Sequence, residues 1–172
     1  ALLRVLNDAR GLPLSLFRSF CSQDRPFAVP QPPADVPVDV SIIVPVYNKW
    51  ALTRACLASI AYTNAGVGIS YEVILADDSS SDETLRAQEL VPGLRIARTP
   101  QNMGFLRNCN HAAKLARGRH ILLLNNDTVV LPGWLDAMHR TLEGDDSIAI
   151  VGSKLLYPNG RIQEAGGGML AN

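Results

Sequence analysis

The chain has 172 residues and a mass of 18.6 kDa, a length that fits one globular domain or one domain with a tail. Apolar residues make up 47% of it and charged residues 19%, which allows a sizeable core and excludes wholesale disorder. The 16 basic and 16 acidic residues cancel, so binding to nucleic acid through a global basic field is disfavoured. No window approaches about 18 consecutive apolar residues, so we expect no membrane span.

Cysteine and histidine usage indicates neither a disulfide framework nor a zinc site. The three cysteines, Cys21, Cys56 and Cys109, are odd in number and widely spaced. The three histidines form no HxxxH or HExxH pattern. The N-terminus also lacks the basic, apolar, small-residue order of a signal peptide. A reduced, cytoplasmic protein is therefore expected, and peripheral association with the inner face of the membrane stays open.

Residues 1–38 differ in composition from the rest and are expected to form a helical and proline-rich arm or linker. Their first twenty residues allow one or two short amphipathic helices, broken at Gly11 and Pro13. Prolines then recur from Pro26 to Pro37, which favours an extended segment. This segment either connects to something upstream or lies across a surface of the domain.

From residue 38 onward, short β-branched runs alternate with segments of helical period. Strict alternation predicts an α/β fold with an open, mainly parallel sheet and helices on both faces. The expected elements are a strand at 40–44, a helix at 48–63, a strand at 71–76, a helix from a capping box at 80–83 to Leu90, a strand at 94–97, a helix at 105–116 stopped by Gly118, a strand at 120–124, a helix at 132–142, a strand at 148–151, and a turn at 157–160 between two strands.

Polar residues gather where the predicted strands end, at 45–48, 77–81, 99–104 and 125–128. In open α/β sheets, ligands bind beyond the carboxyl ends of the strands. Neither GxGxxG nor GxxxxGK[ST] follows a strand, which disfavours a dinucleotide site and a Walker-type nucleotidase. If a phosphate binds at this edge, a divalent metal held by Asp127 is the obvious way to offset its charge.

Each acidic segment also has a structural interpretation. Asp77 and Asp78 precede serines and Asp82, which could cap the following helix, and Asn126-Asp127 could be an ordinary turn. Because both segments fall on the same sheet edge, a functional role for at least one is favoured. A phosphoacceptor receiver domain is disfavoured, because it needs an acidic pair after its first strand, where Pro45, Val46 and Tyr47 stand here.

Four motifs in order resemble family 2 glycosyltransferases of the GT-A fold. They are VSIIVPVYN at 40–48, VILADDSSSDET at 73–84, NMGF at 102–105 followed by Asn108 and Asn110, and LLLNNDT at 122–128 in the place of the DXD-type metal motif. PGWL at 132–135 follows as in the family. The resemblance covers roughly 38–170, and the segment 151–167 looks most like bacterial O-antigen and other surface-polysaccharide enzymes, including rhamnosyltransferase-like ones.

The resemblance implies a GT-A nucleotide-sugar-binding domain at 39–172, incomplete at its C-terminus, and a role for each matched residue. Asp127 would bind Mn²⁺ or Mg²⁺ bridging the donor diphosphate. Asn126, which stands where many relatives have aspartate, would contact ribose or a metal-bound water. The remaining implied nucleotide-binding residues are Pro45, Val46 and Tyr47 around the base, with Tyr47 stacking on it, Asp78 with Asp77 beside it at the base or ribose, Asn102 in the third motif, and Arg107 at the base or phosphate.

The implied activity is inverting transfer of a sugar from a nucleotide-diphosphate sugar to a glycan or lipid-linked acceptor, without nucleic acid as a partner. No residue of this chain is expected to be the general base, which the family places in a later acidic motif, beyond Asn172 here. The chain is then the donor-binding half and inactive alone. An alternative is a non-catalytic, glycosyltransferase-like module that binds or scaffolds.

Overall fold

The structure is a computed structural model that describes residues 25–64, 68–157 and 161–165. The chain divides into two compact units, with the boundary between Val130 and Leu131. We call the described residues up to Val130 the sheet unit and those from Leu131 onward the C-terminal unit. The short helices expected within the first twenty residues lie outside the described part of the chain.

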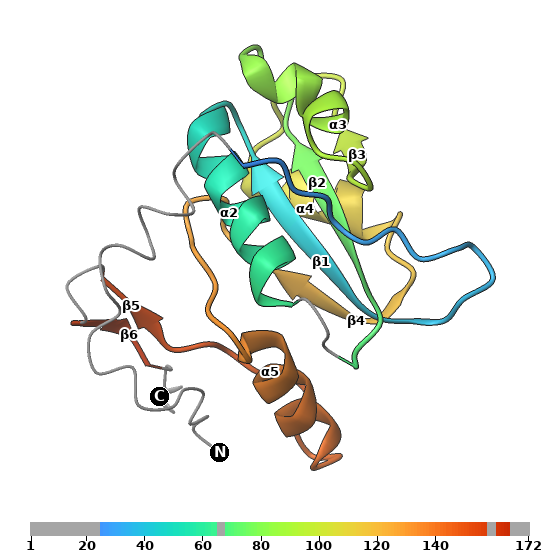
Figure 1. Ribbon diagram of the computed structural model, residues 1–172, viewed down its shortest axis with the longest axis vertical. Coiled ribbons are helices and arrows are strands. Elements are labelled where there is room, and N and C mark those ends of the chain that lie inside the picture. The colour runs from blue at the N-terminus through green and yellow to red at the C-terminus, as the bar shows by residue number, and fades with distance from the viewer. Residues whose placement is uncertain (1–24, 65–67, 158–160, 166–172) are drawn as a thin grey trace, which may run out of the picture. The chain divides into compact units, whose positions relative to one another are not determined.

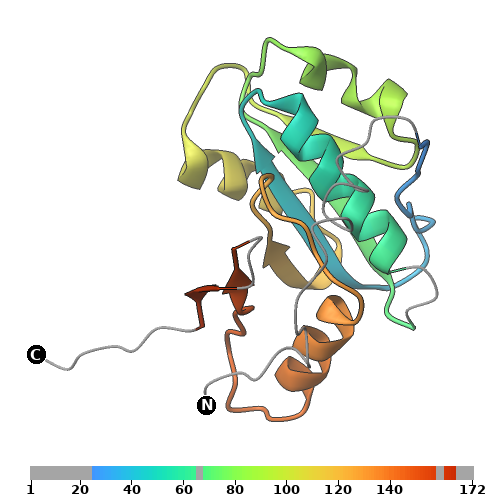
Figure 2. The same cartoon turned by 60° about the vertical axis from the view of Figure 1, so that its left-hand side comes forward.

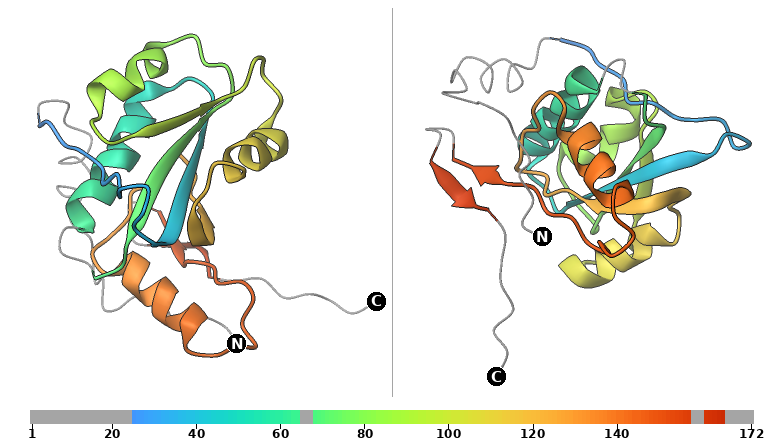
Figure 3. Two further views of the ribbon diagram at one scale, coloured as in Figure 1. Left: turned by 90° about the vertical axis from the view of Figure 1, so that its right-hand side faces the viewer. Right: turned by 90° about the horizontal axis from the view of Figure 1, so that it is seen from below.

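The sheet unit is built on a four-stranded parallel sheet with the order β3-β2-β1-β4 (Figure 1). Helices α2 and α4 lie on opposite faces of it (Figure 2; Figure 3, left). This confirms the predicted parallel α/β architecture. The elements are β1 (Val38–Val46), α2 (Trp50–Thr63), β2 (Tyr71–Asp77), the 3₁₀ helix η1 (Glu83–Arg86), α3 (Ala87–Leu90), β3 (Arg95–Arg98), α4 (Phe105–Ala113) and β4 (Gly118–Leu123).

The two central strands are covered on both faces, which explains their continuous apolar sequences. Ile42, Ile43 and Val44 of β1 are fully buried, and all seven residues of β2 are buried. The register pairs Val46 with Asp77, so β1 and β2 end side by side. After β3 the chain returns to the other side of β1 to form β4. The switch point of the sheet therefore lies between β1 and β4, where open α/β sheets bind their ligands.

Residues 25–37 run as an extended arm along the sheet unit (Figure 1). Phe27 and Val29 are buried, and the Val29 amide donates to the Pro92 carbonyl at 3.0 Å. Gly93, with φ of 85°, allows this approach, because a Cβ there would lie 2.0 Å from the Val29 carbonyl oxygen. The described part of the proline-rich stretch therefore packs on the sheet unit through Phe27 and Val29.

The C-terminal unit contains α5 (Trp134–Glu143) and an antiparallel pair, β5 (Leu155–Leu156) and β6 (Ile162–Glu164). The Tyr157 amide donates to the Arg161 carbonyl at 2.8 Å, which closes the chain reversal between the two strands. The predicted turn between strands is confirmed at its flanks, while residues 158–160 lie outside the described part.

Three sequence predictions are wrong in detail. Residues 148–151 form no strand, although three of the four are β-branched, and Ala149 and Ile150 are exposed. The capping box expected at 80–83 does not form, because the helix begins as 3₁₀ at Glu83 with Asp82, one of the predicted caps, as its N-cap. Helix α4 ends at Ala113, and Gly118 starts β4 instead of stopping the helix. Gly118 is there for close approach, because a Cβ would lie 2.3 Å from the Ser41 amide nitrogen.

Candidate functional site

The turns after β1 and β2 hold all the non-glycine residues with positive φ in the described chain. These are Asn48 at 58°, Lys49 at 61° and Ser79 at 65°. A left-handed conformation is unfavourable for residues with a Cβ, by about 1–2 kcal/mol each, and persists only where surrounding contacts impose it. Such outliers gather at binding and catalytic sites. Their grouping here marks the carboxyl ends of β1 and β2 as the candidate site.

The Asn48 side chain holds these two turns together. Its side-chain Oδ1 accepts from the backbone amides of Ser81 at 2.8 Å and Asp82 at 3.3 Å. The backbone amide of Asn48 donates to Ser80 Oγ at 2.8 Å. The left-handed backbone at Asn48 therefore follows from three hydrogen bonds across 32 to 34 residues of sequence. Asparagine tolerates this conformation better than most residues.

Asp77 is buried and both of its carboxylate oxygens have protein partners. Oδ1 accepts from the Ser80 amide at 2.9 Å, and Oδ2 pairs with Arg98 Nη1. Arg98 also donates to the Ser80 carbonyl at 2.7 Å, so it fixes the turn from β3. Arg98 was not among the site residues predicted from the sequence. Its only sequence signal is a charged residue at the carboxyl end of a strand beside the acidic pair.

Asp78 is also buried, and it holds the loop that precedes α4. Its Oδ1 accepts from the Met103 amide at 2.8 Å and the Thr99 hydroxyl at 2.9 Å, and its Oδ2 accepts from the Gly104 amide at 2.8 Å. The backbone of Gly104, with φ of 81°, then opens α4. Asp78 thus shapes the loop that carries Asn102 and precedes Arg107.

Asp82 caps two helices at once, a role that the sequence could assign only in part. Its Oδ2 accepts from the Trp50 amide at the start of α2 at 3.0 Å, and its Oδ1 accepts from the Thr84 amide at 3.0 Å. Burial by itself would raise the pKa of Asp82, but these donors outweigh it and lower the pKa below its usual value. The cap to η1 was among the structural alternatives, while the cap to α2 crosses 32 residues and has no local signal.

The loop after β4 places Asp127 at the surface beside anchored neighbours. Asn126 donates through Nδ2 to Thr53 Oγ1 at 2.9 Å, and the Thr128 hydroxyl donates to the Asn125 carbonyl at 2.7 Å. Asp127 is exposed, and among the described residues nothing forms a hydrogen bond or ion pair with its carboxylate. An unpaired carboxylate of this kind remains available to a ligand.

The other predicted nucleotide-binding residues divide into buried and exposed groups. Pro45 and Val46 lie buried within the end of β1. Tyr47 is 54% exposed directly after them, and Asn102 and Arg107 are exposed on the loop before α4 and on its first turn. Within the described chain, the side chains of these three exposed residues have no hydrogen-bond or ion-pair partner.

The arrangement fits a divalent cation bound together with a phosphate. Mg²⁺ and similar ions are held by one or two carboxylates together with substrate phosphate oxygens and waters. Asp127 supplies one such carboxylate, and Asn126 keeps its Oδ1 as a further hard acceptor because its Nδ2 makes the bond to Thr53. The donor set is made of oxygen atoms, as these ions require.

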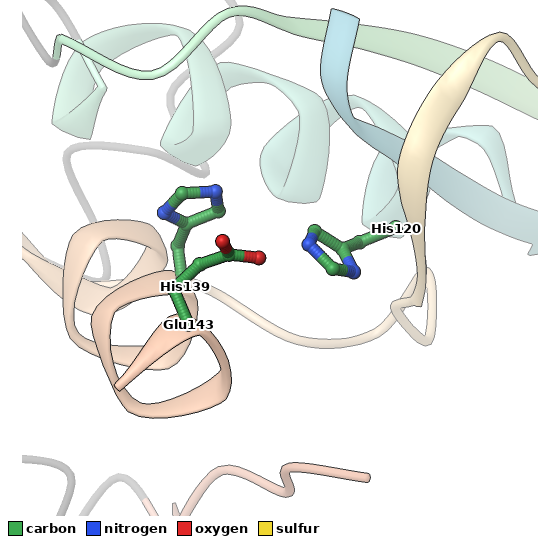
Figure 4. A group of neighbouring side chains, drawn as sticks. All are labelled: His120, His139 and Glu143. Atoms are coloured by element: carbon green, nitrogen blue, oxygen red, sulfur yellow. The ribbon is translucent and has the colours of Figure 1, made fainter. Parts of the chain in front are cut away.

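Two other features are a depression in the sheet unit and a pair of titratable side chains in the C-terminal unit. An open depression of about 390 Å³ lies between the arm and the start of β2, lined by Pro30, Pro32 and Tyr71 among others. In the C-terminal unit, His139 and Glu143 lie four residues apart on α5, and Figure 4 draws them with His120 of the sheet unit. No third His, Cys, Asp or Glu from the described part of the C-terminal unit joins this pair, so that unit alone forms no metal centre.

Comparison with known proteins decides the family. Residues 41–164 match the profile described as Glycosyl transferase family 2. The chain belongs to this family. The match includes the first, second, third and fourth motifs and continues into β6, and it confirms the resemblance found in the sequence.

Curated relatives of this family 2 chain include proteins of bacterial polysaccharide synthesis. An uncharacterised protein of Mycobacterium tuberculosis is 34% identical over 113 residues, covering 64% of this chain and 34% of that protein. The O-antigen biosynthesis protein RfbC of Myxococcus xanthus is 35% identical over 135 residues, covering 74% of this chain and 10% of RfbC. The matched region is thus about a third or less of each of these relatives.

Among solved structures, TarS of S. aureus (residues 1–349) superposes with a TM-score of 0.53 and 24% identity, covering 62% of this chain and 33% of TarS. This likeness concerns the fold and confirms the predicted GT-A type, with its Rossmann-like parallel sheet. No helix of the described residues has the length and apolar character needed to cross a bilayer.

Proposed function

We propose that this chain forms the donor-binding part of a glycosyltransferase that uses a nucleotide-diphosphate sugar. The observation that carries the proposal is the exposed, unpaired Asp127 at the switch point of the sheet, next to the strained turns after β1 and β2. Membership of family 2 supports the same conclusion. Strained backbone costs stability, and a ligand that uses these turns explains why the strain is present.

We assign the diphosphate and its cation to Asp127, with Asn126 beside it. Bound there, Mn²⁺ or Mg²⁺ would stabilise the negative charge that builds on the departing diphosphate. Asp127 keeps its carboxylate exposed, and Asn126 is already held against Thr53 before any ligand binds. This is the preorganisation that electrostatic catalysis requires.

We assign the base and ribose to the turn after β1 and the loop before α4. Tyr47 offers an exposed ring for stacking on the base, next to the buried Pro45 and Val46.

Asp78 already accepts three hydrogen bonds from the protein, so only one lone pair of its carboxylate remains for a ligand. We propose that it acts mainly by holding the loop that carries Asn102. Arg107 is free to reach a phosphate or base. Asp77 positions the turn through Ser80 and Arg98.

The proposed reaction is a single displacement with inversion. The acceptor hydroxyl oxygen forms a bond to the anomeric carbon as the bond from that carbon to the diphosphate oxygen breaks. The hydroxyl proton passes to a carboxylate base, which we assign to no described residue of this chain. The acceptor is proposed to be a growing bacterial surface glycan or a lipid-linked precursor, in line with the relative RfbC. We also propose that the reaction takes place on the cytoplasmic side of the membrane.

The experiment that tests the proposal is calorimetric titration of this chain with UDP, GDP and dTDP, each with and without Mn²⁺. Binding of one nucleotide that strengthens at least tenfold with Mn²⁺ is the expected result, and it would identify the donor class. A nucleotide affinity that is the same with and without Mn²⁺ would contradict the proposed metal-binding role of Asp127. No binding of any nucleotide would contradict the donor-binding proposal for this chain and favour a scaffolding module.

A further inference from the structure

Helix α2 turns a stripe of small polar side chains toward the loop after β4. Thr53, Cys56 and Ser59 follow one another at a spacing of three residues, and each has an exposed fraction of 0%. Residues three apart on a helix lie on nearly the same face. Burying a polar side chain costs free energy unless it forms a hydrogen bond. The three buried hydroxyl and thiol groups on this helix face therefore need hydrogen-bond partners.

Each of the three side chains meets a different polar group of that loop. Thr53 Oγ1 accepts from Asn126 Nδ2 at 2.9 Å, Cys56 Sγ lies 3.7 Å from the Asn125 carbonyl as donor, and Ser59 Oγ accepts from the Val130 amide at 3.0 Å. Ser59 also donates to the Cys56 carbonyl at 2.7 Å, which orients its lone pairs toward Val130. The contacts join positions 69 to 73 residues apart in sequence.

These contacts fix the loop on both sides of Asp127 and leave its carboxylate free. Asn125 and Asn126 are bound before it and Val130 is bound after it. No regular secondary structure runs from Leu124 to Val130 to hold these groups in another way. An apolar residue at position 53 would leave the Asn126 amide without its partner.

We propose that Thr53, Cys56 and Ser59 are positioning residues that hold Asp127 in place for the metal and diphosphate. This inference rests on the proposed function. It assigns to α2 the task of linking the metal loop to the turns after β1 and β2, because Asp82 anchors the N-terminus of the same helix through Trp50. A shift of about 1 Å in a group that binds the reacting part of a substrate is costly, so such anchoring matters to function.

The electrostatics of Cys56 agree with a neutral donor at this place. The pKa of the Cys56 thiol is raised to about 12, mainly by burial. A hydrogen bond with the Thr128 side chain lowers this pKa, and the negative charge of Asp127 raises it. The thiol therefore stays protonated at neutral pH and adds no second negative charge near Asp127. A thiolate there would compete with the carboxylate for the cation.

The test compares Thr53→Val with Thr53→Ser in this chain. Valine has nearly the shape of threonine but cannot accept from Asn126, whereas serine keeps the hydroxyl. Thr63→Val is the matched control, because Thr63 bonds only within α2, through its hydroxyl to the Ser59 carbonyl at 2.7 Å. The readout is the dissociation constant for the tightest-binding of UDP, GDP and dTDP, with and without Mn²⁺, and for Mn²⁺ itself by water-proton relaxation.

We expect Thr53→Val to weaken the Mn²⁺-dependent affinity about tenfold, the scale of one lost hydrogen bond, with the metal-free affinity unchanged. Thr53→Ser should restore wild-type affinity, and Thr63→Val should not alter it. A general loss of packing would weaken both affinities and would not be rescued by serine. If Thr53→Val does not fold, Ser59→Ala serves as the second variant and should give the same selective loss.

Two failures are distinguishable. If the wild-type chain binds no nucleotide, the proposed function is overturned and the positioning role with it. If it binds a nucleotide equally well with and without Mn²⁺, the metal role of Asp127 and the positioning role are overturned while donor binding stands. If the wild-type chain does bind and Thr53→Val matches Thr53→Ser in Mn²⁺-dependent affinity, the positioning role alone is overturned. A Thr53→Val variant that weakens metal-free binding equally would also overturn it.

Discussion

The two ends of the sheet use carboxylates in opposite ways. At the amino end, Glu72 is fully buried and is surrounded by donors, from Ser41 Oγ at 2.7 Å, from the Arg117 amide at 2.8 Å and from Arg95. Arg117 then donates to the carbonyls of Pro32 and Pro33 at 2.9 and 3.0 Å, which fastens the arm. At the carboxyl end, Asp127 is exposed and has no such donors among the described residues.

Acidic side chains alone therefore do not locate a binding site. Glu72 has ordinary backbone around it and a closed set of partners, whereas the carboxyl end combines strained turns with exposed, unpaired Tyr47, Arg107 and Asp127. Asp78 and Asp82 occupy an intermediate position, because they lie at the site but their oxygens are bound by the protein. The following variants should separate these classes by how strongly each changes the free energy of unfolding.

The largest expected effect is that of Glu72→Gln at the amino end. Removing the charge leaves Arg95 and Arg117 without their buried partner, so we expect the free energy of unfolding to fall by about 3–5 kcal/mol in denaturant titration at pH 7. Glu89→Gln, which breaks the exposed pair with Arg86, is the control and should cost at most about 0.5 kcal/mol. Equal losses of unfolding free energy in Glu72→Gln and Glu89→Gln would show that the buried carboxylate contributes no more to stability than the exposed one.

The stability difference between wild type and Glu72→Gln is expected to depend on pH. Burial by itself would raise the pKa of Glu72, but hydrogen bonds from Arg117, Ser41 and Arg95 outweigh it and lower the pKa below 4.5. A lowered folded pKa stabilises the charged protein above the pKa of the unfolded chain, and this contribution is lost as pH falls through the folded value. The gap in stability between wild type and Glu72→Gln should therefore narrow below about pH 4.5. A gap that widens on acidification would show that Glu72 is not held as a carboxylate.

Asp78→Ala should have the next largest effect and should change binding as well. It leaves the Met103 and Gly104 amides and the Thr99 hydroxyl without an acceptor, at a cost of about 2–3 kcal/mol in unfolding free energy. Because the loop of Asn102 loses its anchor, nucleotide affinity should fall with and without Mn²⁺. An effect on affinity that disappears when Mn²⁺ is withheld would place Asp78 at the metal instead.

Asp82→Ala should cost about 1–2 kcal/mol, since it removes the cap of α2 and that of η1 together. Thermal unfolding measures this loss, and Asp82→Asn should recover part of it because asparagine also caps helices. Asp145→Ala is a useful control, because Asp145 caps only a short exposed turn through Ser147. A loss as small as that of the control would mean that the two caps contribute nothing.

The smallest effect on stability should be that of Asp127→Ala, although its effect on binding should be the largest. With no protein partner for the carboxylate, the free energy of unfolding should stay within about 0.5 kcal/mol of wild type. Under the proposed function, the Mn²⁺ dependence of nucleotide binding should vanish in calorimetry. Retained Mn²⁺ dependence would remove Asp127 from the metal site, and a large loss of stability would show that it has a structural partner.

Much of the fold follows from local sequence. The apolar runs that became β1 and β2 were predicted because a strand covered on both faces reads as a continuous apolar run. The edge strand β4 was predicted from its run of isoleucine and leucine, although its residues are alternately half-buried and exposed. The same reasoning failed at 148–151, because this run is β-branched but has no partner strand, and a strand exists only where hydrogen-bonding neighbours complete it. Alternation of strands and helices was enough to predict the parallel sheet and the edge where its polar residues meet.

Tertiary structure decided which carboxylates at that edge accept hydrogen bonds from the protein and which one does not. The sequence placed Asp77, Asp78 and Asp127 at strand ends and assigned the metal to Asp127 alone, but nothing local predicts which carboxylate has three donors and which has none. That difference depends on contacts such as Asp78 with Gly104 and Asn126 with Thr53, which span 26 and 73 residues. Hydrogen-bond partners at such separations are set by the register of the strands and the packing of α2, which the local pattern does not encode.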